Sequence, residues 1–292
     1  MNSRVDHRPA RRRLLLCLPG LAAATGIRAA APRRRVSLGG TVTEIVFALG
    51  AGDQLVGVDQ SSFHPEAASR LPKVGYYRGF SVEGVAALRP DLVLASDQAG
   101  PPRALAQLRQ LGNEVITVPS APKVEALLAA IDVIAQALEQ VARGRELAGE
   151  VSAGVALAGR RSAAAPVRVL LLSSHTGKLQ AAGRETAADA LLALAGAANV
   201  FSSQSGYKAI SAEAVAAMQP DVIVTTTLSL RSIGSLAEFV AQPGIAVTPA
   251  ARNRRVVVMD DLLLLGFGPR LPQALRELQD GLSAGPALPR HS

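Results

Sequence analysis

A fourteen-residue segment occurs twice in the chain, at a constant offset of 130 residues. Residues 81–94 read SVEGVAALRPDLVL, and residues 211–224 read SAEAVAAMQPDVIV. In both copies a serine, a preferred N-cap residue, precedes a helical run. A Pro-Asp pair then separates this run from an apolar stretch typical of a buried strand. The repeat predicts two lobes built on the same helix–turn–strand unit.

Short apolar runs alternate with helical segments over most of the chain. The predicted strands are residues 35–38, 55–58, 91–95, 114–118, 167–172, 221–225 and 256–259, and the intervening helices are about ten residues long. This alternation is typical of βαβ units and parallel sheets. We therefore predict an α/β fold with two Rossmann-like lobes and parallel sheets.

Residues 123–161 interrupt the alternation with an Ala-rich, helical stretch that contains no strand candidate. Its glycines at 144, 149 and 154 are expected to break or loosen the helix, and a helix over residues 139–161 would extend about 35 Å. We predict an N-terminal lobe over residues 36–138, a single linking helix over 139–163 and a C-terminal lobe over 164–285. The ligand cleft is expected between the lobes.

The basic excess of the chain is confined to its N-terminus. The net charge is +8, and residues 1–35 carry all of it, because the remainder holds 22 basic and 22 acidic residues. Arg11, Arg12 and Arg13 precede an apolar stretch and then small residues, which are the three parts of a signal peptide. We expect residues 1–31 to direct export to the periplasm, by the general or the twin-arginine route. A neutral body gives no electrostatic case for nucleic-acid binding.

The residue types disfavour most enzyme classes. Cys17 is the only cysteine and lies in the signal segment, so the exported chain has no thiolate metal site or cysteine nucleophile. The sequence has no HExxH motif and no complete phosphate-binding loop. We expect no enzymatic activity, although a two-lobed chelatase has the same kind of fold.

Three stretches resemble a known family. They are residues 75–84 (GYYRGFSVEG), residues 174–190 with Ser-His at their start, and residues 264–270 (LLGFGPR). With the repeat, the linking helix and the signal peptide, they are similar to class III substrate-binding proteins of ABC importers, which serve vitamin B12, ferric siderophores and haem. The three stretches resemble the haem-binding branch in particular, and the resemblance extends from about residue 36 to residue 283.

Tyr76 is the candidate ligand of the haem iron. A phenolate is a hard anionic ligand that suits ferric iron, and tyrosine is an axial haem ligand in some proteins. A nearby cation favours the phenolate, and in an extended segment Arg78 points the same way as Tyr76 while Tyr77 points away. The resemblance implies the same ligand, with Arg78 bonded to the phenolate or to a propionate. Tyr77 stands where the family commonly has an apolar residue, so its own contact with haem stays open. The alternative for Tyr76 is a tyrosine that only packs at the cleft edge.

Three more residues are candidates for haem contact. His175 follows the strand at 167–172, at the carboxyl end where α/β sheets place ligands. Both an iron ligand and a histidine that only hydrogen-bonds fit this position. Tyr207 stands at the repeat position of Tyr77, which predicts it on the facing wall of the cleft. The resemblance assigns Arg270 to a propionate, through bidentate pairing.

The repeat also makes Glu83 and Glu213 equivalent. Each follows its capping serine by two residues, where a carboxylate favours the positive end of a helix, and this local role is sufficient to account for both. The alternative is that each lobe presents one carboxylate to a two-fold symmetric permease dimer.

The sequence thus predicts a periplasmic haem-binding protein. Ferric protoporphyrin IX is the expected transported ligand, at one haem per chain, with His175 leaving a second haem open. The expected partners are an ABC importer, consisting of a permease dimer and its ATPase, and an outer-membrane receptor that supplies haem. The alternatives are a siderophore- or cobalamin-binding protein of the same class, or a chelatase-like periplasmic enzyme.

Overall fold

The structure is a computed structural model that describes residues 33–161, 166–174 and 178–284. The predicted signal segment, residues 1–31, and the candidate His175 lie outside these residues. Within them, no helix combines the length and the apolar character that a membrane span requires.

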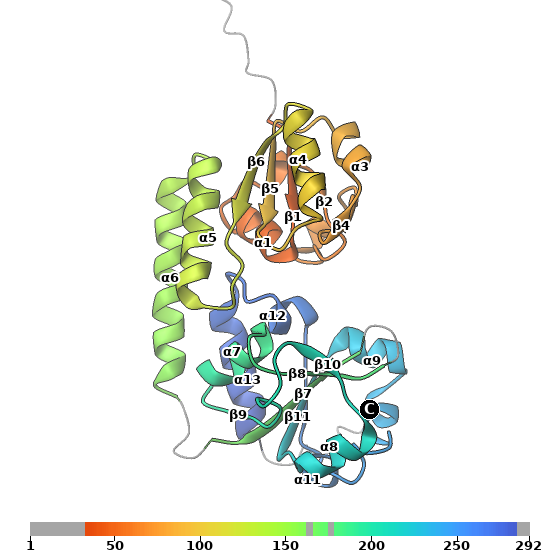
Figure 1. Cartoon of the computed structure of the whole chain (residues 1–292). Helices are drawn as coiled ribbons and strands as arrows, with labels where there is room; N and C mark the ends of the chain where they lie inside the picture. The colour runs from red at the N-terminus through yellow and green to blue at the C-terminus, as the bar shows by residue number, and fades with distance from the viewer. Residues whose placement is uncertain (1–32, 162–165, 175–177, 285–292) are drawn as a thin grey trace, which may run out of the picture. The chain divides into compact units, whose positions relative to one another are not determined.

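The first sheet is parallel throughout and has the strand order β2-β1-β5-β6 (Figure 1). Its strands are β1 (Arg35–Leu38), β2 (Leu55–Val58), β5 (Leu92–Ser96) and β6 (Glu114–Val118). The helices between them are α1 (Gly40–Ala48), the 3-10 helix η1 (Gly52–Gln54), α2 (Glu66–Ser69), α3 (Val82–Ala87) and α4 (Pro102–Gln110). A separate two-stranded hairpin, β3 (Gly75–Tyr76) and β4 (Gly79–Phe80), follows α2.

The second sheet is mixed, with the strand order β10-β8-β7-β11-β12 and with β9 paired to β7. Its strands are β7 (Arg168–Ser173), β8 (Gln180–Ala182), β9 (Ala198–Asn199), β10 (Tyr207–Ala209), β11 (Val222–Thr226) and β12 (Val256–Met259). Pairing is parallel from β7 to β12, as predicted, but β8 and β10 pair antiparallel. The connection from β7 to β8 is too short for the helical crossover that a parallel pair needs, so the chain turns back on itself.

The second sheet is accompanied by seven helices within the described residues. They are α7 (Ala187–Leu194), α8 (Ala212–Met218), α9 (Thr227–Ile233), α10 (Leu236–Val240), α11 (Pro249–Arg252), α12 (Asp261–Leu265) and α13 (Leu271–Ser283). Two α/β lobes are therefore present, which confirms the predicted fold class.

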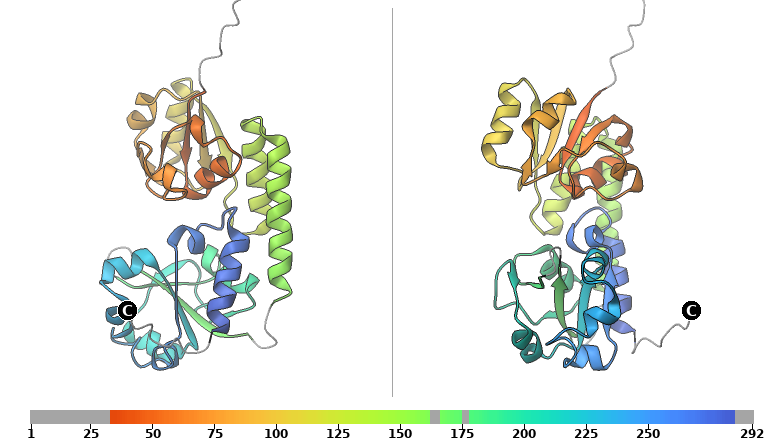
Figure 2. Two further views of the ribbon diagram at one scale, coloured as in Figure 1. Left: turned by 180° about the vertical axis from the view of Figure 1, so that it is seen from behind. Right: turned by 90° about the vertical axis from the view of Figure 1, so that its right-hand side faces the viewer.

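Two helices, α5 (Val124–Ala137) and α6 (Val141–Gly159), lie between the sheets in the sequence. They run side by side, and α6 also contacts α13 (Figures 1 and 2). The expectation that glycines break this helix was wrong. A Cβ on Gly144 would lie 2.4 Å from the Cβ of Ala135, and one on Gly154 would lie 2.5 Å from that of Pro272. Both glycines allow close packing against a neighbouring helix.

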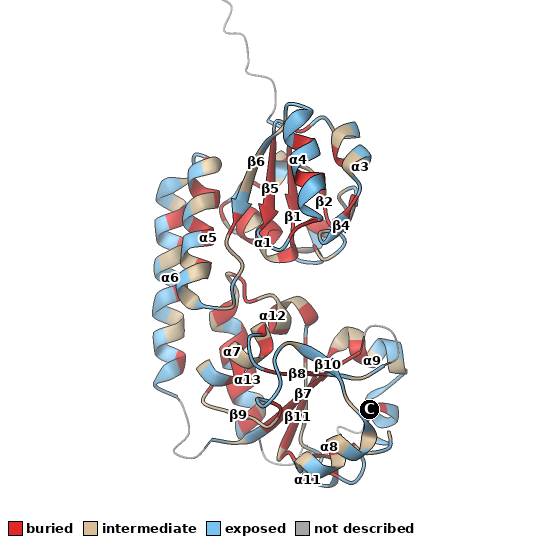
Figure 3. Cartoon of the chain, in the orientation of Figure 1, coloured by how far each residue is buried: buried red, intermediate tan, exposed pale blue. Residues whose placement is uncertain are grey.

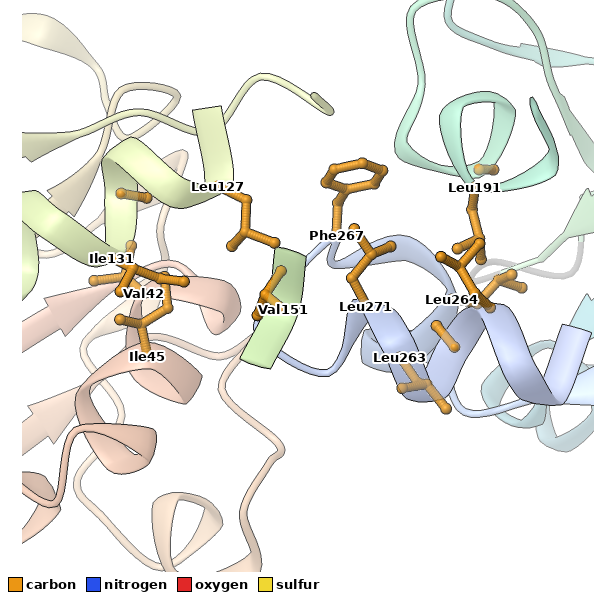
Figure 4. Close-up of a cluster of buried hydrophobic side chains, with 14 of the residues drawn as sticks. Val42, Ile45, Leu127, Ile131, Val151, Leu191, Leu263, Leu264, Phe267 and Leu271 are labelled. Atoms are coloured by element: carbon orange, nitrogen blue, oxygen red, sulfur yellow. The ribbon is translucent and has the colours of Figure 1, made fainter. Parts of the chain in front are cut away.

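One hydrophobic cluster extends from the helices of the first lobe to those of the second (Figures 3 and 4). Ile45 of α1, Ile131 of α5 and Val151 of α6 belong to it, and so do Leu264 of α12 and Leu271 of α13. All five side chains are buried. The hydrophobic effect therefore stabilises the packing of α6 with both lobes, in addition to the separate apolar cluster inside each lobe.

The sequence repeat has the same structure in both copies. The hydroxyl of Ser81 accepts a hydrogen bond from the Gly84 amide and caps α3, and that of Ser211 accepts one from the Ala214 amide and caps α8. After each helix the chain passes through a left-handed residue, Arg89 with φ 46° or Gln219 with φ 44°. The repeat therefore includes the conformation of the turn.

Each copy of the repeat accepts hydrogen bonds from an arginine at or directly before the start of the first strand of its lobe, β1 or β7. The sequence analysis did not predict these contacts. The Arg34 amide donates to the Asp91 carboxylate at 2.9 Å, and its guanidinium donates to the Leu88 carbonyl at 2.7 Å. Arg168 makes the same two contacts, with Asp221 at 3.2 Å and the Met218 carbonyl at 2.7 Å. The two lobes thus share one architecture around the repeat.

Candidate functional site

The candidate ligand Tyr76 lies on a tight β-hairpin. Gly75 pairs with Phe80 and Tyr76 with Gly79, so Tyr77 and Arg78 alone form the connecting turn. Gly75 has φ +101°, and a Cβ there would lie 3.2 Å from the Cα of Phe80. A glycine is required at this position because other residues are strained at such a φ value. The hairpin leaves the Tyr76 side chain 44% exposed.

The turn changes the predicted directions of the side chains. The Tyr76 and Tyr77 rings are in contact, with centroids 4.7 Å apart and planes inclined by 63°. The Arg78 guanidinium lies 5.1 Å from the Tyr77 ring centroid, in a cation–π contact. The condition under which Tyr77 would face away from Tyr76, an extended segment, is not met, because the extended conformation ends at Tyr76. Among the described residues, no hydrogen bond joins Arg78 to the Tyr76 hydroxyl.

Tyr77 is less suited than Tyr76 to bind iron. Its ring is half-buried and packs against the apolar cluster of the first lobe. Burial raises the pKa of Tyr77 well above its ordinary value, and the neighbouring Tyr76 raises it further. Tyr77 is therefore harder to deprotonate than an ordinary tyrosine, and a protonated phenol is a poor ligand for ferric iron.

Tyr207 belongs to the antiparallel edge of the second sheet, where it pairs with Ala182. Its side chain is 39% exposed, yet the surrounding protein atoms still raise its pKa to about 12. The Ala188 amide, the Thr186 hydroxyl and the Arg78 charge oppose this rise. The place of Tyr207 on the facing wall of the cleft stays a prediction.

Arg270 is engaged by a partner that the sequence analysis did not identify. Its Nε donates to Glu44 Oε1 at 2.9 Å, its Nη2 contacts the same oxygen, and Asp260 Oδ1 lies 3.7 Å from Nη2. The Glu44 side chain is 3% exposed and that of Arg270 is 19% exposed. Close by, the Thr41 hydroxyl donates to the Gly266 carbonyl at 2.6 Å. Glu44 is the one charged residue of helix α1, and its carboxylate was the sequence signal for this ion pair.

The larger of two small hollows lies beside this ion pair and not beside the tyrosines. Its volume is about 350 Å³, and α1, α6 and the start of α13 contribute to its walls, including Glu44, Arg143 and Arg270. The other hollow, about 20 Å³, has room for a single water molecule. Tyr76 and Tyr207 line neither of these two hollows, and both side chains are exposed.

The buried Glu44 makes stability depend on pH. Burial raises the pKa of Glu44 from 4.5 to about 7, against the opposing effect of Arg270. Between these values the folded chain binds more protons than the unfolded chain, so the free energy of unfolding falls as the pH rises. The loss attributable to Glu44 is about 3 kcal/mol.

We expect Glu44→Gln to remove this component. The difference in unfolding free energy, wild type minus variant, should decrease by about 3 kcal/mol from pH 4.5 to pH 7.5. Urea unfolding of both proteins at each pH measures it, and subtraction cancels the other titrating groups. A difference that does not change with pH would show that folding leaves the pKa of Glu44 unchanged.

Glu83 and Glu213 are exposed and lie in the first turns of α3 and α8. The Ser81 hydroxyl donates to Glu83 at 3.3 Å. Hydrogen bonds from its own amide and from Ser211 lower the pKa of Glu213. Both carboxylates thus contribute to capping, and both remain accessible to a partner.

Phe63 is an exposed aromatic residue that the sequence analysis missed. Its side chain is 53% exposed, more than that of Tyr76 or Tyr207. It lies on the segment between β2 and α2, next to Ser62. Phe63 belongs to no recognisable motif in the sequence. Only the structure shows that its side chain is exposed.

Residues 36–263 match the family described as Periplasmic binding protein. The chain is similar to the structure of the periplasmic heme-binding protein RhuT from Roseiflexus sp. RS-1 in apo form. The two are 41% identical with a TM-score of 0.82, over 86% of this chain and 98% of that chain. The periplasmic heme-binding protein BhuT in complex with two hemes is 42% identical with a TM-score of 0.79, over 86% and 99%.

Curated relatives agree on the family. An uncharacterized ABC transporter substrate-binding lipoprotein, YvrC of Bacillus subtilis (strain 168), is 30% identical over 258 residues, which are 86% of this chain and 80% of that one. Vitamin B12-binding proteins are also among these relatives, for example at 28% and 30% identity. The family match covers both sheets, the repeat and the two central helices. The chain therefore belongs to the periplasmic binding protein family and has its two-lobed class III architecture.

Proposed function

We propose that the protein captures ferric haem between its two lobes and delivers it to an ABC importer. The observation that carries this proposal is the exposed Tyr76, presented by a constrained hairpin. The similar structures named above are heme-binding proteins at 41% and 42% identity. A transported ligand must be released again, and a single exposed phenolate is a simpler contact to break than a closed set of ligands.

The residues around Tyr76 have separate tasks in this proposal. Tyr76 binds the iron as phenolate, whereas the half-buried Tyr77 offers its ring to the porphyrin edge. Arg78 lies over the Tyr77 ring and is available to a propionate, because its guanidinium can form bidentate hydrogen bonds with a carboxylate. Tyr207 contributes contact area from the second lobe.

The support for haem contact by Arg270 and by His175 is weaker than that for Tyr76. Arg270 is the propionate partner of the sequence-based prediction, but its guanidinium must leave Glu44 to act in this way. Its pairing favours a role in holding α1 to the start of α13. His175 remains a candidate for a second iron, and a similar structure holds two hemes.

Cobalamin is the second candidate ligand, because some relatives are vitamin B12-binding proteins. The identity to these relatives is lower than to the heme-binding structures. The family and the similar structures are binding proteins, which makes a chelatase-like activity the least supported alternative.

We expect hemin titration to reach its endpoint near one equivalent per chain, with Tyr76 as the iron ligand. Visible absorbance of the protein under stepwise addition of hemin measures the endpoint. Cobalamin, added in a parallel titration, is expected to leave the protein's intrinsic tyrosine fluorescence unchanged after correction for absorption. An endpoint near two that returns to one in His175→Ala would contradict a single haem and would assign an iron to His175.

The proposed route completes the function. The segment of residues 1–31 exports the chain to the periplasm, an outer-membrane receptor supplies haem, and a permease dimer with its ATPase accepts it. The ABC transporter relative supports an importer as partner. Glu83 and Glu213 are the proposed docking residues, one on each lobe.

A further inference from the structure

A fully buried carboxylate lies directly behind the tyrosine hairpin. Asp59 is 0% exposed and follows β2. Its Oδ1 accepts hydrogen bonds from the Gly39 amide at 3.0 Å and the Ser62 hydroxyl at 2.8 Å. Its Oδ2 accepts from the Ser61 amide at 2.9 Å, the Ser61 hydroxyl at 2.6 Å and the Tyr77 amide at 3.3 Å. Five donors therefore converge on one side chain.

These donors come from three separate parts of the first lobe. Gly39 precedes α1 as its N-cap, Ser61 and Ser62 belong to the segment after β2, and Tyr77 is in the hairpin turn. A buried carboxylate is tolerated only where hydrogen bonds or opposite charge replace its water. Its donor set therefore constrains all three segments together.

A positive charge and backbone contacts strengthen the same junction. The Lys73 ammonium donates to the carbonyls of Ser62 and Ala68, and the charge of Asp59 opposes the lowering of the Lys73 pKa by burial. The Gln60 amide donates to the Gly75 carbonyl at 2.8 Å. The loop that carries Asp59 is thus bonded to the start of the hairpin as well as to its turn.

The hairpin needs such an external support. Its strands have only two residues each, and an isolated two-stranded hairpin is at best marginally stable in water. The Tyr77 amide belongs to the peptide that joins Tyr76 to Tyr77, so a hydrogen bond to this amide limits rotation of the backbone at Tyr76. The direction of the Tyr76 phenol depends on that backbone.

From this geometry we infer that Asp59 is a positioning residue, which holds the Tyr76–Tyr77 peptide so that the Tyr76 phenolate meets the haem iron. The inference rests on the proposed function. Asp59 itself touches neither the iron nor the porphyrin, because it is fully buried.

Two substitutions of Asp59 have different expected results. Asp59→Ala removes every acceptor and leaves the Tyr77 amide unpaired. Asp59→Asn keeps one side-chain oxygen. We expect the asparagine to direct this oxygen at Ser61 and Tyr77 and its NH2 group toward Gly39, because this orientation leaves the fewest backbone amides unpaired. The asparagine variant should therefore lose stability but retain the position of the turn.

The test compares hemin complexes of the full-length variants by visible absorbance and by affinity. We expect Asp59→Ala to lose most of the ferric–phenolate charge-transfer band and to bind hemin about 10–100-fold more weakly, as for other residues that orient metal ligands. Asp59→Asn should restore the band. Asp261→Ala is the matched control, since Asp261 is also buried and accepts from the Leu228 amide, but in the second lobe. It should lower stability and keep the band.

A wild-type band in folded Asp59→Ala would overturn the positioning role. If Asp59→Ala does not fold, Ser61→Ala and Ser62→Ala test the positioning role instead. They remove the hydroxyl donors to Asp59 Oδ2 and Oδ1, respectively. Only the first affects the oxygen that holds the Tyr77 amide, so only Ser61→Ala should weaken the band. Equal spectra for the two variants would overturn the inference. A wild-type complex that lacks the band would instead refute iron binding by Tyr76, whereas the absence of any wild-type hemin complex would refute the proposed function.

Discussion

Replacing Tyr76 with alanine is expected to abolish the ferric–phenolate charge-transfer band of the hemin complex and to weaken hemin binding by about 100-fold or more. Loss of residues that merely orient a metal ligand costs about 10–100-fold, so loss of the ligand itself should cost at least as much. The side chain is 44% exposed, and its removal leaves no large cavity in the core. The variant should therefore fold, and visible spectra with a competitive hemin titration measure the effect.

Tyr77→Phe is the matched control for this experiment. It keeps the ring beside Tyr76 and the amide bonded to Asp59, and it removes only a hydroxyl whose pKa is raised by burial. We expect an unchanged band and an affinity within about 3-fold of wild type. An unchanged band in Tyr76→Ala, with loss of the band in Tyr77→Phe, would transfer the iron to Tyr77.

The fold could be predicted from the sequence because local and long-range signals agree. The apolar runs at 35–38, 55–58, 114–118 and 256–259 are strands with the same bounds in the structure. Each run consists mostly of β-branched or large apolar residues and lies between turn residues or helices. The repeat added the long-range information that two such units are present.

The antiparallel strands of the second sheet were not predicted. The strand β10 holds only Tyr207, Lys208 and Ala209, all exposed, and thus carries no apolar run. The chain turns back after β7, so β8 pairs antiparallel with β7, and β10 then pairs with the free edge of β8. The glycines of α6 led to the wrong expectation of a broken helix for a related reason. Two of them allow close contact with Ala135 and Pro272, which belong to other helices and cannot be identified from the pattern of α6 alone.

The site was predictable in its residue types but not in its contacts. A Gly-Tyr-Tyr-Arg segment indicates a phenol near a cation, yet the hairpin turn places Arg78 over Tyr77 and not beside Tyr76. The partner of Arg270 is 226 residues away in the sequence. Asp59 looked like an ordinary residue at a strand end, and only the tertiary structure shows the donors that meet on it.

The equivalence of Glu83 and Glu213 leads to the prediction with the largest effect on transport. Their helices have the same caps and the same pattern of buried and exposed residues, so the two carboxylates occupy equivalent places in the two copies of the repeat. A permease dimer has a true two-fold axis and offers each lobe the same surface. We expect the double variant Glu83→Lys and Glu213→Lys to stop haem delivery while hemin binding stays intact.

The matched control separates docking from helix capping. Glu125 and Glu238 are also exposed carboxylates in first helical turns, but they are not related by the repeat. The double variant Glu125→Lys and Glu238→Lys therefore makes the same change in net charge and disturbs the same kind of helix terminus.

Haem uptake into vesicles that contain the transporter measures delivery, with hemin titration of both variants as the binding control. Charge pairs at an interface rim act on association and weaken with salt, so wild-type uptake should fall as ionic strength rises. Normal uptake by the Glu83 and Glu213 variant would leave helix capping as the whole role of both residues, and equal loss in both double variants would assign the effect to net charge.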